Sequence, residues 1–257
     1  MNAALRLGAF LMRIRPAPLA ALLKRLLRVE RIEIVTPDGR FWVDPASYLG
    51  QELMRHQVYE PTMLGALKEY LRPGGVFVDL GANEGYFSVV GARLVGSQGR
   101  VLTIEPQRRL EPVLRRNFVL NRCDQVTLVT VAISDRPGSG RLNLTPSPNN
   151  GASGFLAPTR YPLFRQPVAL ATLTQVLGEA GIARCDMMKI DIEGWEYEAV
   201  LGSREVFTAR RVRTLALELH PHLLALRGFD SGAITQFLAA CGYHEVNSRG
   251  QTLFILD

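Results

Sequence analysis

The sequence predicts an α/β protein in which a mostly parallel, twisted sheet carries helices on both faces. Three observations lead to this prediction. Five short runs rich in Val, Ile and Leu begin at residue 76, as expected of strands that are buried on both faces. Helical stretches separate most of these runs. A glycine-containing turn follows the first run, at the place where an open α/β sheet binds its ligand.

Residues 1–72 are expected to form a lead-in to this sheet. Two short helices are separated by Pro16 and Pro18, because proline removes a helical donor and restricts the residue before it. The turn Thr36-Pro37-Asp38-Gly39 between two strand-like runs predicts a β-hairpin. In chain order, the expected elements are helices at 3–14 and 18–29, strands at Arg31–Val35 and Arg40–Val43, and a helical stretch from Tyr48 to Leu71.

Residues 73–257 form the second expected unit, which holds the alternating strands and helices. Its strands are expected at Val76–Leu80, Val101–Ile104, Val126–Val131, Met187–Ile192 and Thr214–Leu219, and its helices at 85–95, 107–121, 171–180, 195–208 and 231–241. Two last runs, Tyr243–Val246 and Thr252–Leu256, predict an antiparallel hairpin. Residues 136–168 break the alternation, and an insertion of this length is more typical of a substrate loop than of a connector.

The net charge of +6 belongs to one end of the chain. Residues 1–28 hold six basic side chains and no acidic one, so the other 229 residues carry 24 basic and 24 acidic side chains. A nucleic-acid partner is therefore not expected for the folded part. Residues 1–28 are also rich in leucine, which leaves two interpretations open: a helical cap packed on the core, or an element that contacts a membrane surface or a protein.

The three cysteines are odd in number and widely spaced, so neither a disulfide framework nor a zinc site is expected. The longest uncharged apolar run near the N-terminus, Leu7–Met12, is too short for a signal peptide, and no run approaches the length of a transmembrane helix. We therefore expect a cytoplasmic protein that is membrane-associated if residues 1–28 bind lipid.

The most informative segment is the turn Asp79-Leu80-Gly81-Ala82-Asn83-Glu84-Gly85. Its glycines permit positive φ and let the backbone approach a ligand closely. Glu105 stands at the end of the next expected strand, where a carboxylate accepts hydrogen bonds from ribose hydroxyls. A tight turn with only a structural role is the alternative, but the turn and the strand-end acid together indicate a ligand with an adenosine-type ribose.

The glycine spacing selects among nucleotide cofactors. The dinucleotide fingerprint G-x-G-x-x-G does not fit, because Asn83 and Tyr86 stand where it requires its second and third glycines. The observed D-x-G-x-N-x-G resembles motif I of class I S-adenosylmethionine-dependent methyltransferases. In that motif the turn holds the amino-acid end of the cofactor. Asp79 is expected beneath it, bonded to loop amides or, through water, to the cofactor's ammonium.

Together with the segment from Lys189 to Gly194, this turn resembles the FkbM family of methyltransferases. The family pattern is D-x-G-A-N-x-G, an acid-Pro pair, L-x-x-N-x-x-x-N, K-x-D-x-E-G and E-x-H. The matching positions are Asp79 to Gly85, Glu105-Pro106, Leu114 with Asn117 and Asn121, Lys189 to Gly194, and Glu218-Leu219-His220; Tyr59-Glu60-Pro61 also resembles a segment that precedes the family's first motif. The resemblance runs from about residue 41 to the C-terminus.

The resemblance implies a Rossmann-like class I methyltransferase fold with an N-terminal helical and β-hairpin extension. It also implies an enzyme that uses S-adenosylmethionine and releases S-adenosylhomocysteine, and that methylates an oxygen of a sugar, glycoconjugate or secondary metabolite. The segment Val131 to Asp135 should flank the adenine. The cofactor-binding residues are expected to be Glu60, Asp79, Gly81, Ala82, Asn83, Gly85, Tyr86, Glu105, Pro106, Ala132 and Asp191.

Acid and base groups gather at the ends of two neighbouring expected strands. Residues two apart on a strand share a face, so Lys189, Asp191 and Glu193 are expected on one face while the backbone stays extended. Glu218 and His220 are likewise expected together on the neighbouring strand, so that these groups converge on one cleft. Removal of a hydroxyl proton needs a general base, and we expect His220 or Asp191 to act as one. Lys189 and Glu193 would orient that base or the acceptor. In the plainer alternative, Asp191 only caps a helix.

Three other possibilities stay open at this stage. His220 and His222, with Glu218 or Asp191, offer ligands for a divalent cation, although Pro221 between the histidines disfavours a shared face and we expect no metal. Two alternatives to a methyltransferase also stay open: an NAD-type nucleotide-dependent sugar-modifying enzyme, and a catalytically silent partner protein. The loop Asn149 to Ser153 is expected to close over a small-molecule or glycan acceptor, with a solvated surface loop as the alternative.

Overall fold

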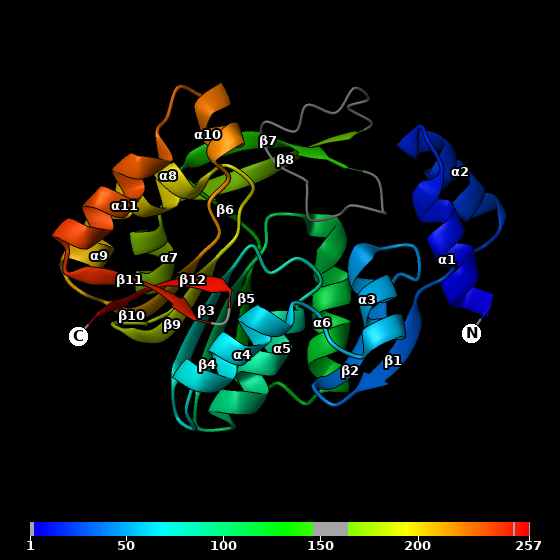
Figure 1. Ribbon diagram of the computed structural model, residues 1–257, viewed down its shortest axis with the longest axis horizontal. Coiled ribbons are helices and arrows are strands. Elements are labelled where there is room, and N and C mark those ends of the chain that lie inside the picture. Colours follow the sequence, from blue (N-terminus) through cyan, green and yellow to red (C-terminus); the bar gives the residue numbers. More distant parts are fainter. Residues whose placement is uncertain (1–2, 146–163, 249, 257) are drawn as a thin grey trace.

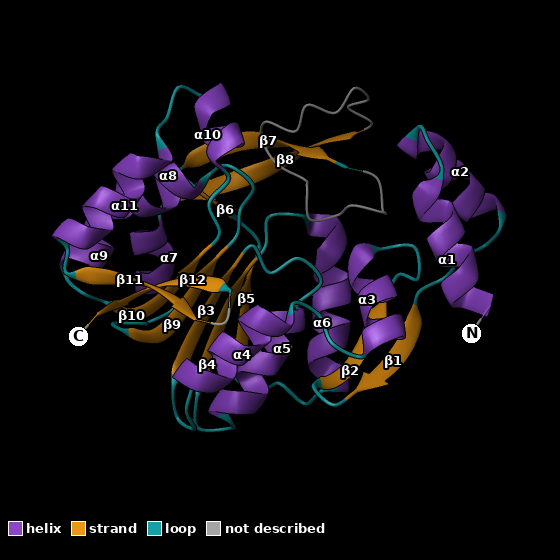
Figure 2. Cartoon of the chain, in the orientation of Figure 1, coloured by secondary structure: helices purple, strands orange, loops and turns teal. Residues whose placement is uncertain are grey.

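The computed structural model describes residues 3–145, 164–248 and 250–256, and its central element is a seven-stranded sheet (Figures 1 and 2). The strand order is β11-β12-β10-β9-β3-β4-β5. Its strands are β3 (Val76–Leu80), β4 (Arg100–Ile104), β5 (Val126–Val129), β9 (Cys185–Ile190), β10 (Val212–Leu217), β11 (Tyr243–Ser248) and β12 (Gln251–Leu256). Strands β5, β4, β3, β9 and β10 pair in parallel, whereas β12 is antiparallel to both β10 and β11. The predicted sheet and terminal hairpin are confirmed.

Helices cover both faces of the sheet, as predicted (Figure 2). Neighbouring strand residues point to opposite faces, so Phe77 and Met187 belong to one apolar cluster and Val78 and Met188 to another. The first cluster includes α4 (Pro61–Tyr70), α5 (Tyr86–Val95) and α6 (Glu111–Leu120). The second includes α7 (Leu173–Glu179), α8 (Glu196–Val200), α9 (Arg204–Thr208) and α11 (Ser231–Ala240). The long apolar runs of the sequence reflect this burial on both faces.

The N-terminal part contains α1 (Ala3–Arg13), α2 (Ala17–Leu26), the predicted hairpin of β1 (Ile32–Thr36) and β2 (Gly39–Val43), and α3 (Tyr48–His56). Asn117 on α6 and Asn121, the C-cap residue of that helix, hold this hairpin. The Asn117 side chain accepts from the Trp42 amide at 2.7 Å and donates to the Glu84 carbonyl at 2.8 Å, while Asn121 accepts from the Arg40 amide at 2.9 Å. These bonds explain why asparagines occupy both positions of the L-x-x-N-x-x-x-N segment. A unit boundary at residue 72 stays a prediction.

Several predicted elements differ from the structure. The stretch 48–71 is two helices, α3 and α4, because Gln57 and Glu60 adopt left-handed backbone conformations between them. The loop expected at 136–168 is wrong at both ends: β7 (Gly138–Leu144) pairs with β8 (Phe164–Ala171), and β8 pairs with β6 (Ala132–Ile133), in a second sheet. Residues Asn149 to Ser153 lie outside the described part. The helix α10 (Pro221–Leu226) was not predicted. Within the described ranges, no helix has the length and apolar character needed to cross a membrane.

Candidate functional site

Two adjoining clefts open where the chain reverses direction across the sheet. Strands β4 and β5 lie on one side of β3, and β9 and β10 lie on the other, so the switch point is between β3 and β9. The Glu105 cleft is lined by Leu80, Gly81, Asn83, Glu105, Pro106, Gln107, Val131, Ala132, Ile133, Leu142, Asp191, Ile192, Glu193 and Trp195. The Glu60 cleft is lined by Leu49, Tyr59, Glu60, Gly81, Ala82, Asn83, Glu84, Tyr86, Phe87, Lys189 and Asp191. Gly81, Asn83 and Asp191 line both, so the two clefts meet at the glycine turn.

Gly81 sits where no side chain fits. Its φ is +83°, and a Cβ added there would lie 1.8 Å from the Asp191 carbonyl oxygen. The amides of Gly81 and Ala82 donate to the Ile104 carbonyl at 3.0 and 3.2 Å, which holds the turn against the end of β4. Gly85 also has a φ of +83°, but its Cβ would meet Leu114 on α6 at 2.7 Å. Gly85 lines neither cleft, and the space it leaves is used to pack α5 against α6.

Glu105 is buried at the end of β4 and joins the two sides of the turn. Its Oε2 accepts from the Asn83 amide at 2.8 Å and its Oε1 accepts from the Gln107 amide at 2.9 Å. The Gln107 side chain also hydrogen-bonds this carboxylate, which as an ion offers about four acceptor positions. Burial raises the pKa of this carboxyl to about 7, although the amides of Gln107 and Asn83 oppose the shift. The side chain is therefore fixed in orientation and able to accept further hydrogen bonds.

Asp79 lies beneath the turn, fully buried, as part of β3. Its Oδ2 accepts from the Ser88 hydroxyl, in the first turn of α5, at 2.6 Å, and the Lys189 Nζ is 3.9 Å from its Oδ1. Burial raises the pKa of Asp79, and the Lys189 charge opposes that shift. Asp79 lines neither cleft. Its geometry supports a role in holding the start of α5 and Lys189 in place.

Lys189 is a buried ammonium between carboxylates. Its Nζ lies 3.3 Å from the Asp191 Oδ2 and donates to the Gly81 carbonyl at 3.4 Å. Burial disfavours the charged form, but the carboxylates of Asp191 and Asp79 raise the Lys189 pKa well above its usual range. The lysine therefore stays charged and ties the end of β9 to the glycine turn.

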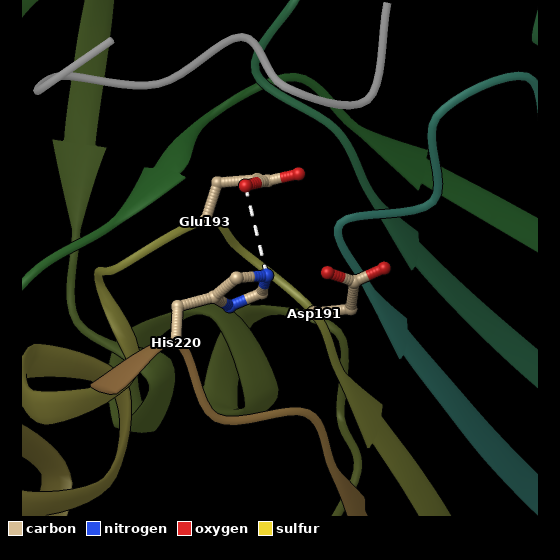
Figure 3. Close-up of side chains that lie close together, drawn as sticks. All are labelled: Asp191, Glu193 and His220. Atoms are coloured by element: carbon tan, nitrogen blue, oxygen red, sulfur yellow. Dashed lines mark ion pairs between the residues drawn. The ribbon is translucent and has the colours of Figure 1, made fainter. Parts of the chain in front are cut away.

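The acidic and basic groups beyond β9 and β10 converge, but not in the predicted way. Strand β9 ends at Ile190, and Glu193 has a left-handed φ of 53°, so the expectation of a shared face on an extended backbone is wrong. Strand β10 ends at Leu217, and His220 is the N-cap of α10. Turns after the strands nevertheless bring Asp191, Glu193 and His220 together, each offering one ligand atom within 4.8 Å of the others (Figure 3). This trio is able to hold a metal ion, and the absence of metal stays a prediction.

Glu196 is the residue that the sequence analysis missed. Its carboxylate is fully buried in the first turn of α8, where Oε1 accepts from the Gly194 amide at 2.9 Å and lies 2.8 Å from the Nδ1 of His220. The other ring nitrogen, Nε2, is 3.6 Å from the Glu193 Oε2 (Figure 3). Burial lowers the pKa of His220, but the Glu196 hydrogen bond and the Glu196 and Glu193 charges raise it to about 9.

Three other carboxylates surround the same edge. Burial raises the pKa of Glu193 to about 7, with His220 opposing the shift. Burial also raises the pKa values of Glu60 in the second cleft and of Glu218. Glu218 lies directly after β10, and Glu60 has a left-handed φ of 40° before α4. These groups, with Asp191, make the edge acidic around the single ammonium of Lys189.

The strand order, with a cleft at its switch point, is that of the Rossmann-like fold of class I S-adenosylmethionine-dependent methyltransferases. The sequence matches the methyltransferase FkbM domain over residues 79–245. The chain therefore belongs to the FkbM methyltransferase family, which confirms the resemblance noted in the sequence. A shorter match, over residues 19–138, is to the family of protein-L-isoaspartate(D-aspartate) O-methyltransferases.

Curated relatives share moderate identity with the chain. The AMB antimetabolite synthetase AmbE of Pseudomonas aeruginosa is 27% identical over 264 residues, which cover 86% of this chain and 12% of AmbE. The 2-O-methyltransferase NoeI of Sinorhizobium fredii is 26% identical over 155 residues, covering 54% of this chain and 62% of NoeI. The chain thus spans less than two thirds of either relative. A solved Aquifex aeolicus SAM-dependent methyltransferase has a TM-score of 0.44 and 14% identity, covering 79% of this chain and 90% of that one.

Proposed function

We propose that this chain transfers the methyl group of S-adenosylmethionine to a hydroxyl of a small-molecule or glycan acceptor, with His220 as the general base. The observation that carries the proposal is the bond between His220 and the buried Glu196. It directs the other ring nitrogen toward Asp191 and Glu193, which line the Glu105 cleft (Figure 3). A paired imidazole beside a nucleotide-type cleft is the arrangement that deprotonation of a hydroxyl requires.

The residues present fit this cofactor. Glu105 retains acceptor capacity for a ribose hydroxyl, and the Oδ1 of Asn83 is buried without a hydrogen-bond partner among the described residues. The acidic groups Glu60 and Asp191 suit a ligand with an ammonium group. When bound, S-adenosylmethionine supplies a methyl group on a positively charged sulfur. The expected contacts of Ala82 and Tyr86 in the Glu60 cleft, and of Pro106 and Ala132 in the Glu105 cleft, agree with where these residues lie.

The side chains divide the remaining work. Glu196 accepts the Nδ1 proton of His220, which selects the tautomer whose Nε2 is able to take a proton from the acceptor hydroxyl. The Glu196 charge then stabilises the imidazolium that forms. The same charge contributes to the raised pKa of His220. Asp191 is held by Lys189 and is placed to orient the acceptor, which makes His220 the better of the two bases predicted.

Oxygen as the methylated atom is supported by two observations. The relative NoeI is a 2-O-methyltransferase. A neutral hydroxyl is a weak nucleophile, and removal of its proton by a base such as His220 strengthens it. Outside residues 1–28 the chain has equal numbers of acidic and basic residues, so an acidic acceptor is not required.

The test combines cofactor binding with methyl transfer. Calorimetry should show binding of S-adenosylhomocysteine and none of NAD, whereas the reverse would favour the nucleotide-dependent sugar-modifying alternative. Incubation with methyl-labelled S-adenosylmethionine and a panel of sugars, oligosaccharides and hydroxylated metabolites should label an oxygen. Binding without transfer to any member of a broad panel would favour the silent partner.

We expect methyl transfer to survive chelation. Loss of activity with EDTA and recovery with Mg²⁺ would instead show that Asp191, Glu193 and His220 bind a metal ion.

A further inference from the structure

The outer surface of α1 and α2 exposes an unusual share of the large apolar side chains. Figure 1 shows these two helices at the outer edge of the molecule, beyond α3. Ten large apolar residues are exposed in the described part of the chain, and five of them lie within this short segment. They are Phe10, Leu19, Leu22, Leu26 and Leu27, with exposed fractions from 43% to 67%. Scattered apolar residues on a surface are ordinary, whereas a cluster of this kind marks an interaction site.

The inner side of the same helices is already anchored. Leu5, Leu11 and Ala20 are buried, and the Gln51 amide donates to the Leu5 carbonyl at 3.2 Å. Lys24 forms an ion pair with the buried Asp44. The cap interpretation therefore accounts for the inner side of the segment, and the exposed apolar residues are not needed for packing it.

The exposed apolar residues alternate with exposed arginines. On α1, Phe10 shares a face with Arg6 and Arg13 at helical spacing. On α2, Leu22 and Leu26 share a face, and Arg25 lies between them in sequence. Residues 1–28 contain no acidic side chain, so no carboxylate within the segment offsets the charge of these exposed arginines.

We propose that α1 and α2 dock the protein on an anionic phospholipid surface. Leucine and phenylalanine side chains enter the boundary between headgroups and acyl chains, and arginines pair with lipid phosphates. A second copy of the chain fits less well, because a symmetric contact would place two uncompensated sets of arginines face to face. The surface goes beyond the proposed methyl transfer, and its test does not depend on catalysis.

The experiment is co-sedimentation of the full chain with vesicles of phosphatidylcholine, with or without phosphatidylglycerol. We expect binding only with phosphatidylglycerol. Because each basic residue near an anionic surface contributes about 1 kcal/mol, the triple variant Arg6→Gln/Arg13→Gln/Arg25→Gln should weaken binding about 100-fold. The variant Leu22→Ser/Leu26→Ser should weaken it at least about tenfold, through lost apolar burial.

Matched controls separate this surface from general effects of exposed apolar residues. Val119 and Leu226 are 71% and 70% exposed on other helices, so Val119→Ser/Leu226→Ser should bind vesicles as the unaltered chain does. Unchanged S-adenosylhomocysteine affinity and circular dichroism would show that the variants fold. Equal binding to both kinds of vesicle, or no loss in the triple variant, would overturn the proposal. Lipid-free dimerisation that is lost in Leu22→Ser/Leu26→Ser, without vesicle binding, would assign the surface to self-association.

Discussion

The two sides of the site are built differently. On the cofactor side, Gly81 and Glu105 follow β3 and β4 directly, and backbone amides of the glycine turn donate to the Ile104 carbonyl and to the Glu105 carboxylate. On the catalytic side, Glu193, Glu196 and His220 leave the strands and meet through turns and the starts of two short helices. The first side depends on where the backbone runs, and the second depends on how side chains pair.

Substitutions on the two sides should therefore impair the protein in different ways. A change on the cofactor side should displace backbone and remove binding. A change on the catalytic side should leave binding in place and slow the reaction, since its groups act on the acceptor proton. The variants below test that division, beginning with the largest expected effect.

Gly81→Ala should abolish cofactor binding. The added Cβ would lie 1.8 Å from the Asp191 carbonyl oxygen, so the turn must move away from β9. We expect the affinity for S-adenosylhomocysteine, measured by calorimetry, to fall about 100-fold or more. Gly74→Ala is the matched control, because Gly74 has a similar φ of +81° but no atom within 4 Å of its Cβ. It should cost about 1–2 kcal/mol of stability in denaturant unfolding and retain affinity. Near-normal binding by Gly81→Ala would show that the glycine turn shifts to accept the side chain without disturbing the cofactor site.

His220→Gln should slow methyl transfer by about 10²- to 10⁴-fold, the usual contribution of a general base. Its S-adenosylhomocysteine affinity should stay close to that of the unaltered chain, because His220 lines neither cleft. The exposed neighbour His222, whose ring centroid is 6.4 Å from that of His220, is the control, and His222→Gln should keep its rate. Asp191→Asn should reduce both rate and affinity, since Asp191 lines both clefts. Normal turnover in His220→Gln and Asp191→Asn together would remove both candidate bases.

The two sides also differ in what the sequence was able to predict. Gly81, Asn83 and Glu105 lie beside their strands, and a glycine pattern with a strand-end acid is a local signal. Glu196 carries no such signal: it lies in the first turn of a helix rather than at a strand end, and a carboxylate there is ordinarily solvated. The left-handed turn at Glu193 was equally invisible, because only Gly194 after it marks a break in an otherwise strand-like run.

Glu196→Gln tests whether that buried carboxylate positions and tunes the base. If His220 is the base, the rate should rise with pH towards about 9, the pKa to which its surroundings raise it, because only the neutral imidazole accepts a proton. Removing the Glu196 charge should move this rise about 1–2 pH units lower and reduce the maximal rate. Glu198→Gln, on the same helix but paired with Arg227, should leave the profile in place. If the pH dependence of the rate does not change in Glu196→Gln, then Glu196 has only a packing role and does not tune His220.

Glu193→Gln should have the smallest effect of these variants, and we expect that effect on the free energy of unfolding. Burial raises the folded-state pKa of Glu193 to about 7, above the unfolded value, so the stability it contributes is fully present below about 4.5 and is lost as pH rises through about 7. A glutamine has no proton to lose and so never places a charge at this buried position. The cofactor-free variant should therefore be about 1–2 kcal/mol more stable than the unaltered chain at pH 8, after allowance for solvent screening. The two should converge near pH 4 in denaturant unfolding. A variant that is less stable at pH 8 would show that the contact with His220 outweighs the burial of the Glu193 charge, and the catalytic side would then be held together by its charges as firmly as the cofactor side is by its backbone.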